Sequence, residues 1–343
     1  KNSQSRKRKQ PNISAQSWRS ASYVNLSLSQ WLLKGPEETW RSELEEHYRR
    51  EPVFALIGGM VKGDWRPIHD FTEENHIPSL FPITDFPVVS ETDWYTLYLS
   101  KGFYQEGESA ARYLNSIAET LEGKAVIEVV RDSIEGRTLS RGFQETWLET
   151  GHQPAVSVTL KKGEPPTAKL LDQVLTGKKQ YTLVLWDGPE ALTALEAIAA
   201  SANKPERILI SSGYLGKSFL TLNEGLRDIT FITYPLGLSQ EKFGYRFDIP
   251  LMKKKVSEDA EKILKKTYSL LNMLTQALIE MRGNYYRDNF LDVIGMMKDQ
   301  RDPLYERLSF GPGQRYASKG CYIVQLGKGP NPELIKKSDW VIY

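Results

Sequence analysis

The sequence predicts an α/β protein with two Rossmann-like lobes, each built on a parallel central sheet. Short apolar runs alternate with helical patterns from about residue 53 to residue 233, which is the spacing of βαβ units in a parallel sheet. Beyond residue 235 this alternation stops, and a long helix leads to a closing antiparallel hairpin. Two α/β blocks followed by a helical return indicate two lobes joined by a hinge that the chain crosses more than once.

The clearest unit in this pattern runs from Pro52 to Pro87. Residues 53–57 are an apolar run of the kind that forms a strand buried on both faces. Gly58-Gly59 ends this run, because glycine turns sharply without a Cβ clash. A helix then precedes a second short strand at 77–81. The loops after both strands leave the carboxyl ends of parallel strands, which is the edge where open α/β sheets bind ligands.

The remaining segments are placed by apolar periodicity and by turn residues. Further strands are predicted at 93–99, 125–130, 155–160, 181–186, 207–210 and 229–233. Helices are predicted at 37–50, 105–121, 138–150, 168–175, 190–201, 257–282 and 289–298, and the hairpin pairs 322–326 with 340–343. The first lobe then comprises residues 22–120 and 235–316, the second comprises 121–234 and 317–343, and the basic residues 1–21 form a poorly ordered leader.

The composition excludes several classes of protein. With 343 residues, of which 40% are hydrophobic and 26% charged, the chain has room for two globular domains. Its net charge of +2 gives no support to nucleic acid binding. Cys321 is the single cysteine, which excludes an internal disulfide, and the four histidines are scattered, so we expect no metal and no cofactor. No run of about 18 apolar residues predicts a membrane span, and no signal peptide is recognised in a chain that begins with Lys1.

Motifs for catalysis are weak. The segment 211–218 follows a strand and ends in Gly-Lys-Ser like a phosphate-binding loop, but Ser211 stands where the motif requires its first glycine. His69, Asp70 and His76 share one predicted helix, where we expect solvation or a salt bridge. Neither GxSxG nor HExxH occurs. We therefore expect that the protein is not an enzyme.

Several segments taken together resemble the type 1 periplasmic binding proteins. The first lobe is matched by VFALIGG, ENHIPSLFPITDFP and YLSKGFYQEGESAARYL, and the second by RDSIEGRTLSRGFQETW and LVLWDGPEALTALEAI. The closing hairpin is matched by SFGPGQ, CYIVQL and DWVIY. Over roughly residues 22–343 the chain is similar to the leucine/isoleucine/valine-binding branch, which serves branched-chain amino acid and amide ABC transporters.

Two stretches resemble a narrower subgroup, in which the binding domain lies beside a cytochrome c domain or is fused to one. These stretches are WLLKGPEETWRSELEEHYRREPVFALIGG and LFPITDFPVV. No CxxCH for haem attachment occurs, so such a domain would lie outside this chain. Compared with the family pattern, the first lobe would lack the strand and long helix with which family members open, or these would lie outside the given sequence.

The resemblance implies a ligand site between the lobes, where loop N–H groups and hydroxyls hold a small molecule. Lys62 would add a positive charge there, or it would be a solvated surface lysine. Asp85 would accept a ligand ammonium, or it would cap a turn. The ligand-binding residues implied for the first lobe are Met60, Lys62 and Gly63 in one loop and Ile83, Thr84 and Asp85 in the next.

In the second lobe, Glu135 stands where relatives have a tyrosine, and Asp187 follows a strand at the cleft edge. Ser212, with Tyr214 nearby, stands where amino acid binders carry an acidic residue for the ligand's ammonium. Tyr234 lines the hinge or belongs to the core. The usual ammonium anchor is therefore missing, and the resemblance implies a small polar ligand without identifying it as an amino acid.

The implied function is that of a periplasmic solute-binding protein that closes two lobes around an amino-acid-like molecule, an amide or an organic acid. Its partner would be an ABC transporter permease. The alternative is a ligand-sensing or partner-binding module linked to a cytochrome c or redox system. Neighbouring permease and ATPase genes would favour transport, and neighbouring cytochrome and dehydrogenase genes would favour the sensor.

Overall fold

The computed structural model describes residues 25–61, 63–90, 92–175, 180–238, 257–297, 299, 302, 304–311 and 313–342. The chain folds into two compact units. Unit 1 comprises Lys1–Ser100 and Lys242–Ser318, and unit 2 comprises Lys101–Glu241 and Lys319–Tyr343. The chain therefore passes from one unit to the other three times. The leader expected at residues 1–21 lies outside the described residues.

The units differ from the predicted lobes mainly in the place of helix α5 (Phe103–Ser116), which belongs to unit 2. The predicted boundary at residue 120 put this helix in the first lobe. In the structure, α5 packs against α6 (Ile134–Glu149) through glycines. A Cβ added to Gly107 would lie 2.1 Å from the carbonyl oxygen of Leu139. This close backbone contact joins segments distant in sequence, so no local pattern reveals it.

Unit 1 contains a parallel sheet of three short strands, in the order β1 (Leu56–Ile57), β2 (Ser79–Leu80) and β3 (Thr96–Leu97). The predicted strand–loop–helix–strand unit is present, with shorter strands than predicted. The expectation that its first strand is buried on both faces is wrong at Ile57, which is 38% exposed. The physical reason is that successive strand residues point to opposite faces, so Ile57 points away from the face on which Leu56 packs against the α3–α4 cluster.

Four helices complete the description of unit 1. They are α3 (Glu37–Arg50), α4 (Arg66–Glu74), α10 (Glu258–Glu280) and α11 (Arg287–Gly295). Helices were predicted at all four places, α3 from its charged residues and the Gly35-Pro36 start signal, and α4 and α10 from apolar residues at helical spacing. One buried cluster joins α3 to α4 through Trp40, Leu44, Ile68 and Phe71.

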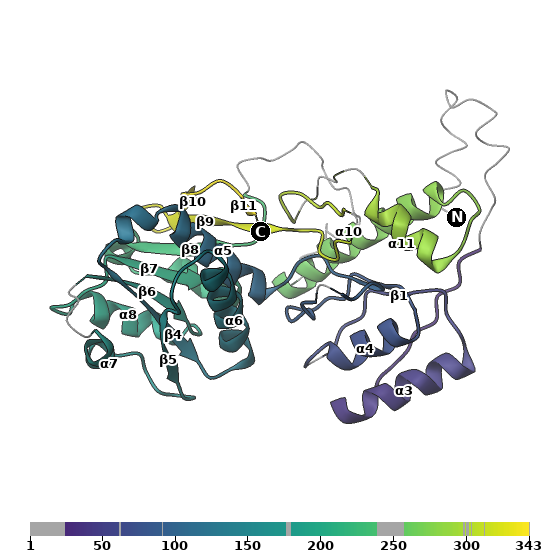
Figure 1. Ribbon diagram of the computed structural model, residues 1–343, viewed down its shortest axis with the longest axis horizontal. Helices are drawn as coiled ribbons and strands as arrows, with labels where there is room; N and C mark the ends of the chain where they lie inside the picture. The colour runs from purple at the N-terminus through teal and green to yellow at the C-terminus, as the bar shows by residue number, and fades with distance from the viewer. Residues whose placement is uncertain are drawn as a thin grey trace, which may run out of the picture. The chain divides into compact units, whose positions relative to one another are not determined.

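Unit 2 is built on a larger sheet in the strand order β10-β9-β8-β7-β6-β4-β5 (Figure 1). Strands β4 to β8 are parallel, and β9 runs antiparallel to β8, β10 and β11. Antiparallel strands are present at both predicted segments, as β9 and β11, but β11 pairs with Gly320 and Cys321. Residues 324–326 pair instead with β10, which was not predicted. The strands are β4 (Ala125–Arg131), β5 (Val156–Leu160), β6 (Tyr181–Trp186), β7 (Arg207–Ser211), β8 (Thr230–Tyr234), β9 (Gly320–Leu326), β10 (Leu334–Lys336) and β11 (Val341–Ile342).

Helices cover both faces of this sheet, with α5 and α6 on one face and α7 (Ala168–Val174) and α8 (Ala191–Ala199) on the other (Figure 1). Successive strand residues point to opposite faces. Ile127 and Val129 of β4 therefore join the apolar core beneath α7 and α8, while Glu128 between them bonds to α6. The remaining short segments are α9 (Ser212–Leu215) and the 3₁₀ helices Ala118–Leu121, Gly216–Thr221 and Glu224–Leu226.

Candidate functional site

In unit 1, the two predicted ligand loops meet at the carboxyl end of the sheet. The turn after β1 begins with Gly58 and Gly59, whose φ angles of +64° and +99° favour glycine. The amide of Ile83, in the loop after β2, donates a hydrogen bond to the carbonyl oxygen of Gly59 at 3.0 Å. Met60 is 58% exposed in the same turn. Met60 and Ile83 therefore lie at one edge of the sheet.

The next two residues of this loop make different contacts. The hydroxyl of Thr84 accepts a hydrogen bond from the amide of Phe86 at 3.0 Å, which is a local turn contact. The carboxylate of Asp85 lies 3.5 Å from Nζ of Lys266, and its side chain is 68% exposed. Asp85 thus faces a lysine that the sequence analysis did not single out.

Lys266 reaches this edge because of where α10 lies. Leu270, one helical turn further along α10, would be 3.5 Å from a Cβ added to Gly58. Burial by itself would lower the pKa of Lys266, but the nearby Tyr305 and Asp85 outweigh it and raise that pKa. A lysine on a charged helix is usually solvated, so its sequence context carried no signal of this role.

The other two residues predicted for the loop after β1 are Lys62 and Gly63. Lys62 lies outside the described residues. Gly63 has a φ angle of +140°, and a Cβ added there would lie 2.9 Å from the Glu37 carboxylate at the start of α3. Gly63 therefore lies against α3.

In unit 2, the carboxyl edge of the sheet is marked by a buried ion pair. Arg131, the last residue of β4, donates from Nε to Oδ1 of Asp187 at 2.7 Å and from Nη2 to Oδ2 at 2.6 Å. The third guanidinium nitrogen, Nη1, donates to the carbonyl oxygen of Lys161. The side chain of Asp187 is almost fully buried. This bidentate geometry fixes both side chains.

Beside this pair, Ser133 joins two elements. Its hydroxyl accepts the amide N–H of Gly136 at 3.1 Å, which caps α6, and lies 2.7 Å from the hydroxyl of Tyr214. Because of this cap, α6 begins at Ile134, whereas the predicted helix begins at residue 138. Glu135 therefore lies in the first helical turn and not in a loop. Burial raises the pKa of Tyr214.

Glu106 of α5 brings a buried carboxylate to the loop after β7. Its Oε2 accepts hydrogen bonds from the hydroxyls of Ser211 at 2.9 Å and Thr233 at 2.6 Å. Its Oε1 would lie 2.2 Å from a Cβ added to Gly213. Ser211 thus provides the hydroxyl that meets Glu106, and the predicted Ser212, which is 8% exposed, begins α9. Glu106 lies between Phe103 and Ala110 on the apolar face of α5. A charged residue on such a face is the sequence signal that could have identified it.

The last predicted residue of the second lobe, Tyr234, ends β8 and packs edge-on against Phe219, with ring centroids 6.4 Å apart. Burial raises its pKa. The contact joins it to the apolar core beneath α7 and α8.

The segment 211–218, which resembles a phosphate-binding loop in sequence, lies in the same region. Gly216–Thr221 forms a 3₁₀ helix. A phosphate loop would instead open an α-helix after its lysine, so this segment does not have the geometry of a phosphate loop.

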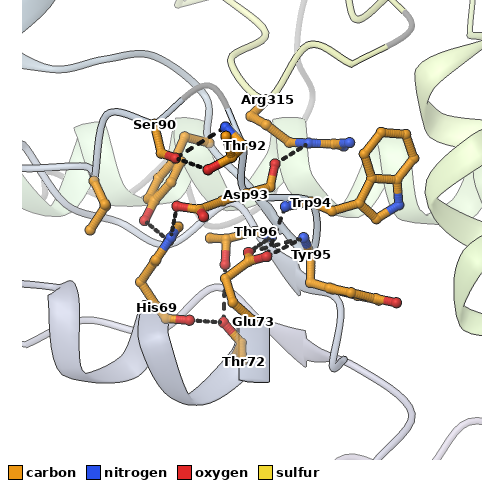
Figure 2. Close-up of polar contacts among 12 residues, drawn as sticks. His69, Thr72, Glu73, Ser90, Thr92, Asp93, Trp94, Tyr95, Thr96 and Arg315 are labelled. Atoms are coloured by element: carbon orange, nitrogen blue, oxygen red, sulfur yellow. Dashed lines mark hydrogen bonds and ion pairs between the residues drawn. The ribbon is translucent and has the colours of Figure 1, made fainter. Parts of the chain in front are cut away.

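A second polar cluster of unit 1 lies at the amino end of β3 (Figure 2). Nε2 of His69 lies 2.7 Å from Oδ2 of Asp93, and Nδ1 lies 2.8 Å from the hydroxyl of Tyr98. Of the two alternatives expected for His69, surface solvation is excluded because the ring is buried, and both ring nitrogens have polar partners within the protein. His76 lies beyond the end of α4 with a φ angle of +51°, so the prediction that it shares this helix is wrong.

The same cluster fixes the loop before β3. The Glu73 carboxylate accepts the backbone N–H groups of Trp94, Tyr95 and Thr96 at 2.7–2.9 Å (Figure 2). The guanidinium of Arg315 stacks on the Trp94 ring at 3.9 Å. These contacts hold the loop before β3 in place, and we infer that the cluster stabilises the fold of unit 1.

Among the described residues, no three histidine, cysteine, aspartate or glutamate side chains gather as metal ligands. No helix within the described ranges is long and apolar enough to cross a membrane.

Comparison with known proteins gives a clear result for the fold. No family model and no curated protein matches the sequence. A substrate-binding protein of an ABC transporter from Sphaerobacter thermophilus matches with a TM-score of 0.66 and 12% identity, over 90% of this chain and 85% of that one. A branched-chain amino acid ABC transporter protein from Thermus thermophilus, with bound valine, matches with a TM-score of 0.63 and 13% identity, over 89% and 82%.

The chain therefore has the type 1 periplasmic binding fold. A third match within this fold is a solute-binding protein from Rhodopseudomonas palustris BisB5 in complex with 3,4-dihydroxybenzoic acid. Its TM-score is 0.58 and its identity 12%, over 89% of this chain and 84% of that one. Structural matches at such low sequence identity show the fold alone, so the ligand has to be argued from the residues of the site.

Proposed function

We propose that the protein is a periplasmic solute-binding protein, which closes two lobes around a small polar ligand and delivers it to an ABC transporter. One observation supports this above the others. In each unit, charged and hydroxyl side chains from separate elements gather at the carboxyl edge of a parallel sheet, as Asp85 and Lys266 do in unit 1 and Arg131, Asp187 and Tyr214 in unit 2. This is the edge at which open α/β sheets bind ligands.

The proposed ligand is amino-acid-like, an amide or an organic acid. Valine and 3,4-dihydroxybenzoic acid, the ligands named for two proteins of this fold, share a carboxyl group and little else. The proposed partner is a transporter permease, the proposed location is the periplasm, and the protein's role is binding without catalysis. The link to a cytochrome c domain rests on sequence resemblance alone.

A thermal-shift screen of the full chain with amino acids, amides and aromatic and short-chain acids tests this function. A ligand that binds the folded state raises its stability by about 2.7 kcal/mol at 100 times its Kd, so we expect a saturable rise in Tm for one ligand class. A well-folded protein that shows no shift with any of these compounds contradicts the proposal.

Two tyrosines of unit 2 give a matched pair of variants. Tyr214 carries its hydroxyl at the carboxyl edge, and Tyr181 donates its hydroxyl to the carbonyl oxygen of Asn203 at the opposite edge. A hydrogen bond is worth about 0.5–1.5 kcal/mol, so we expect Tyr214→Phe to weaken ligand binding by roughly 2- to 12-fold. Tyr181→Phe should leave binding unchanged. Equal effects of the two substitutions would place the ligand elsewhere.

A further inference from the structure

Lys266 combines burial with a position at the ligand edge of unit 1. Its side chain is 18% exposed, so it is mostly buried but not sealed from solvent. The contact of Leu270 with Gly58 and of Lys266 with Asp85 places this turn of α10 beside the loops after β1 and β2. A positive charge thus lies where the fold binds its ligands.

The pairing of Lys266 with Asp85 is loose. The two charged atoms are 3.5 Å apart, whereas the neighbouring Lys265 lies 2.8 Å from Glu261. The carboxylate of Asp85 is mostly hydrated, so it can turn to solvent at little cost. Lys266 has lost most of its hydration, and a buried cation without an anion is strongly disfavoured. Loss of the ion pair would therefore cost more free energy at the buried Lys266 than at the hydrated Asp85.

We propose that Lys266 binds the carboxylate of the ligand, and that Asp85 is the counter-ion which this carboxylate displaces. The inference rests on the proposed function and deepens it, because it makes unit 1 selective for ligands with a carboxylate over their neutral amides. An anion brought to a desolvated ammonium forms a charge-assisted hydrogen bond, which is stronger than one between neutral groups. Lys266 is thus the specificity-determining residue of this edge.

This assignment reverses the role expected for Asp85 from family resemblance. If Asp85 accepts a ligand ammonium, then Asp85→Asn weakens binding. If Asp85 is the displaced counter-ion, then Asp85→Asn removes a competitor and a repulsive charge, so a carboxylate binds more tightly. The two roles therefore predict opposite signs for one substitution.

The test is isothermal titration calorimetry of the full chain with matched pairs of acid and amide: isovalerate with isovaleramide, and benzoate with benzamide. L-valine and L-leucinamide extend the comparison to amino acid ligands. We expect at least one acid to bind more tightly than its amide. Lys266→Met should weaken that acid at least about tenfold, which corresponds to the 1.4 kcal/mol of a modest charged contact, and should change amide binding by less than about threefold.

Three further variants complete the design. Lys266→Arg keeps the charge and should restore acid binding to within about fivefold of the original, and Asp85→Asn should tighten it about two- to fivefold. Lys265→Met, the neighbouring lysine paired with Glu261, is the matched control and should leave binding unchanged. Circular dichroism checks that each variant folds. If Lys266→Met does not fold, Lys266→Arg and Asp85→Asn still test the inference.

Several results would overturn the inference. Equal binding of acid and amide, an unchanged affinity in Lys266→Met, or weaker binding in Asp85→Asn each excludes Lys266 as the carboxylate anchor while leaving the solute-binding function in place. A folded protein that binds no member of the wider thermal-shift panel removes the proposed function and this inference together.

Discussion

At the scale of single residues, Asp187 is held by Arg131 and so combines a structural role with its position at the carboxyl edge of the sheet. Both oxygens of its carboxylate accept from the guanidinium, and Oδ1 also accepts the amide N–H of Gly188 at 2.7 Å. Asp132, the residue after Arg131, forms an ion pair with Arg137 in which both side chains are more than half exposed. The two pairs differ chiefly in burial.

Asp187→Ala should lower the free energy of unfolding by about 3–5 kcal/mol, because it leaves a buried guanidinium without its anion. Asp132→Ala, the control in an exposed pair, should cost about 0–1 kcal/mol. Urea denaturation of both variants measures the difference. Similar small losses in the two variants would show that the Arg131 charge is well solvated.

Glu128 of β4 gives a pH dependence at the same scale. Burial raises the pKa of this carboxyl, although hydrogen bonds from Gln144 and Trp186 partly offset the effect. A carboxyl whose pKa is higher in the folded than in the unfolded protein favours folding at low pH. That contribution is lost as the pH rises through the folded pKa.

The change to measure is Glu128→Gln, which removes the titration. From about pH 4, near the unfolded pKa of 4.3, toward pH 7 the stability of the original protein should fall relative to that of the variant. Urea unfolding at each pH provides the values. Glu149→Gln, at a mostly exposed carboxylate, is the control and should show no such trend. Curves for Glu128→Gln that run parallel to the original protein contradict the prediction.

At the scale of elements, the contact between α5 and α6 assigns α5 to unit 2. A Cβ added to Gly142 of α6 would lie 2.2 Å from the carbonyl oxygen of Tyr104, and Gly107 of α5 makes the reciprocal approach to Leu139. Glycine weakens each helix but allows their backbones to touch. This packing also delivers Glu106 to the ends of β7 and β8.

Gly142→Ala should therefore destabilise the protein by about 1–3 kcal/mol, because overpacking outweighs the better helix propensity of alanine. Gly295 at the end of α11 is the matched control. A Cβ there meets its nearest neighbour at 3.9 Å, so Gly295→Ala should be neutral or stabilising by up to about 1 kcal/mol. Thermal unfolding compares the two, and a Gly142→Ala variant as stable as Gly295→Ala contradicts the packing argument.

At the scale of the whole molecule, the last segment of the chain is a central part of unit 2. All residues of β9 are buried, and the strand lies between β8 and β10. Tyr322, Val324 and Leu326 belong to the core beneath α7 and α8. The carboxyl edge of unit 2 therefore depends on a strand that is distant in sequence from its neighbour β8.

A chain that ends at Ser318 should fail to fold unit 2, because β8 loses its partner and the core loses three apolar side chains. A chain that ends at Asp339 lacks β11 but keeps β9 and β10, and should remain folded with a lower Tm. Limited proteolysis and circular dichroism distinguish these results. Equal protection of unit 2 in both truncated chains would contradict the central role of β9.

The sequence by itself determined the elements with strong local signals. The strand predicted at 181–186 is β6 in the structure, those predicted at 207–210 and 229–233 are β7 and β8 within a residue, and the helix predicted at 257–282 is α10. Apolar periodicity, turn residues and caps act between neighbours in the chain, so they can be recognised without the fold. The alternation of these elements also determined the fold class.

Only the tertiary structure decided which unit holds α5, which partners Glu106 has, and that Lys266 meets Asp85. Each of these features joins residues far apart in the chain, and each depends on how closely two backbones approach. Burial of a charged side chain is a property of such contacts, because water is excluded by several elements at once. Tertiary packing therefore completes the carboxyl edges of both units, because it adds Lys266 and Glu106 to the loop residues that the sequence had already placed there.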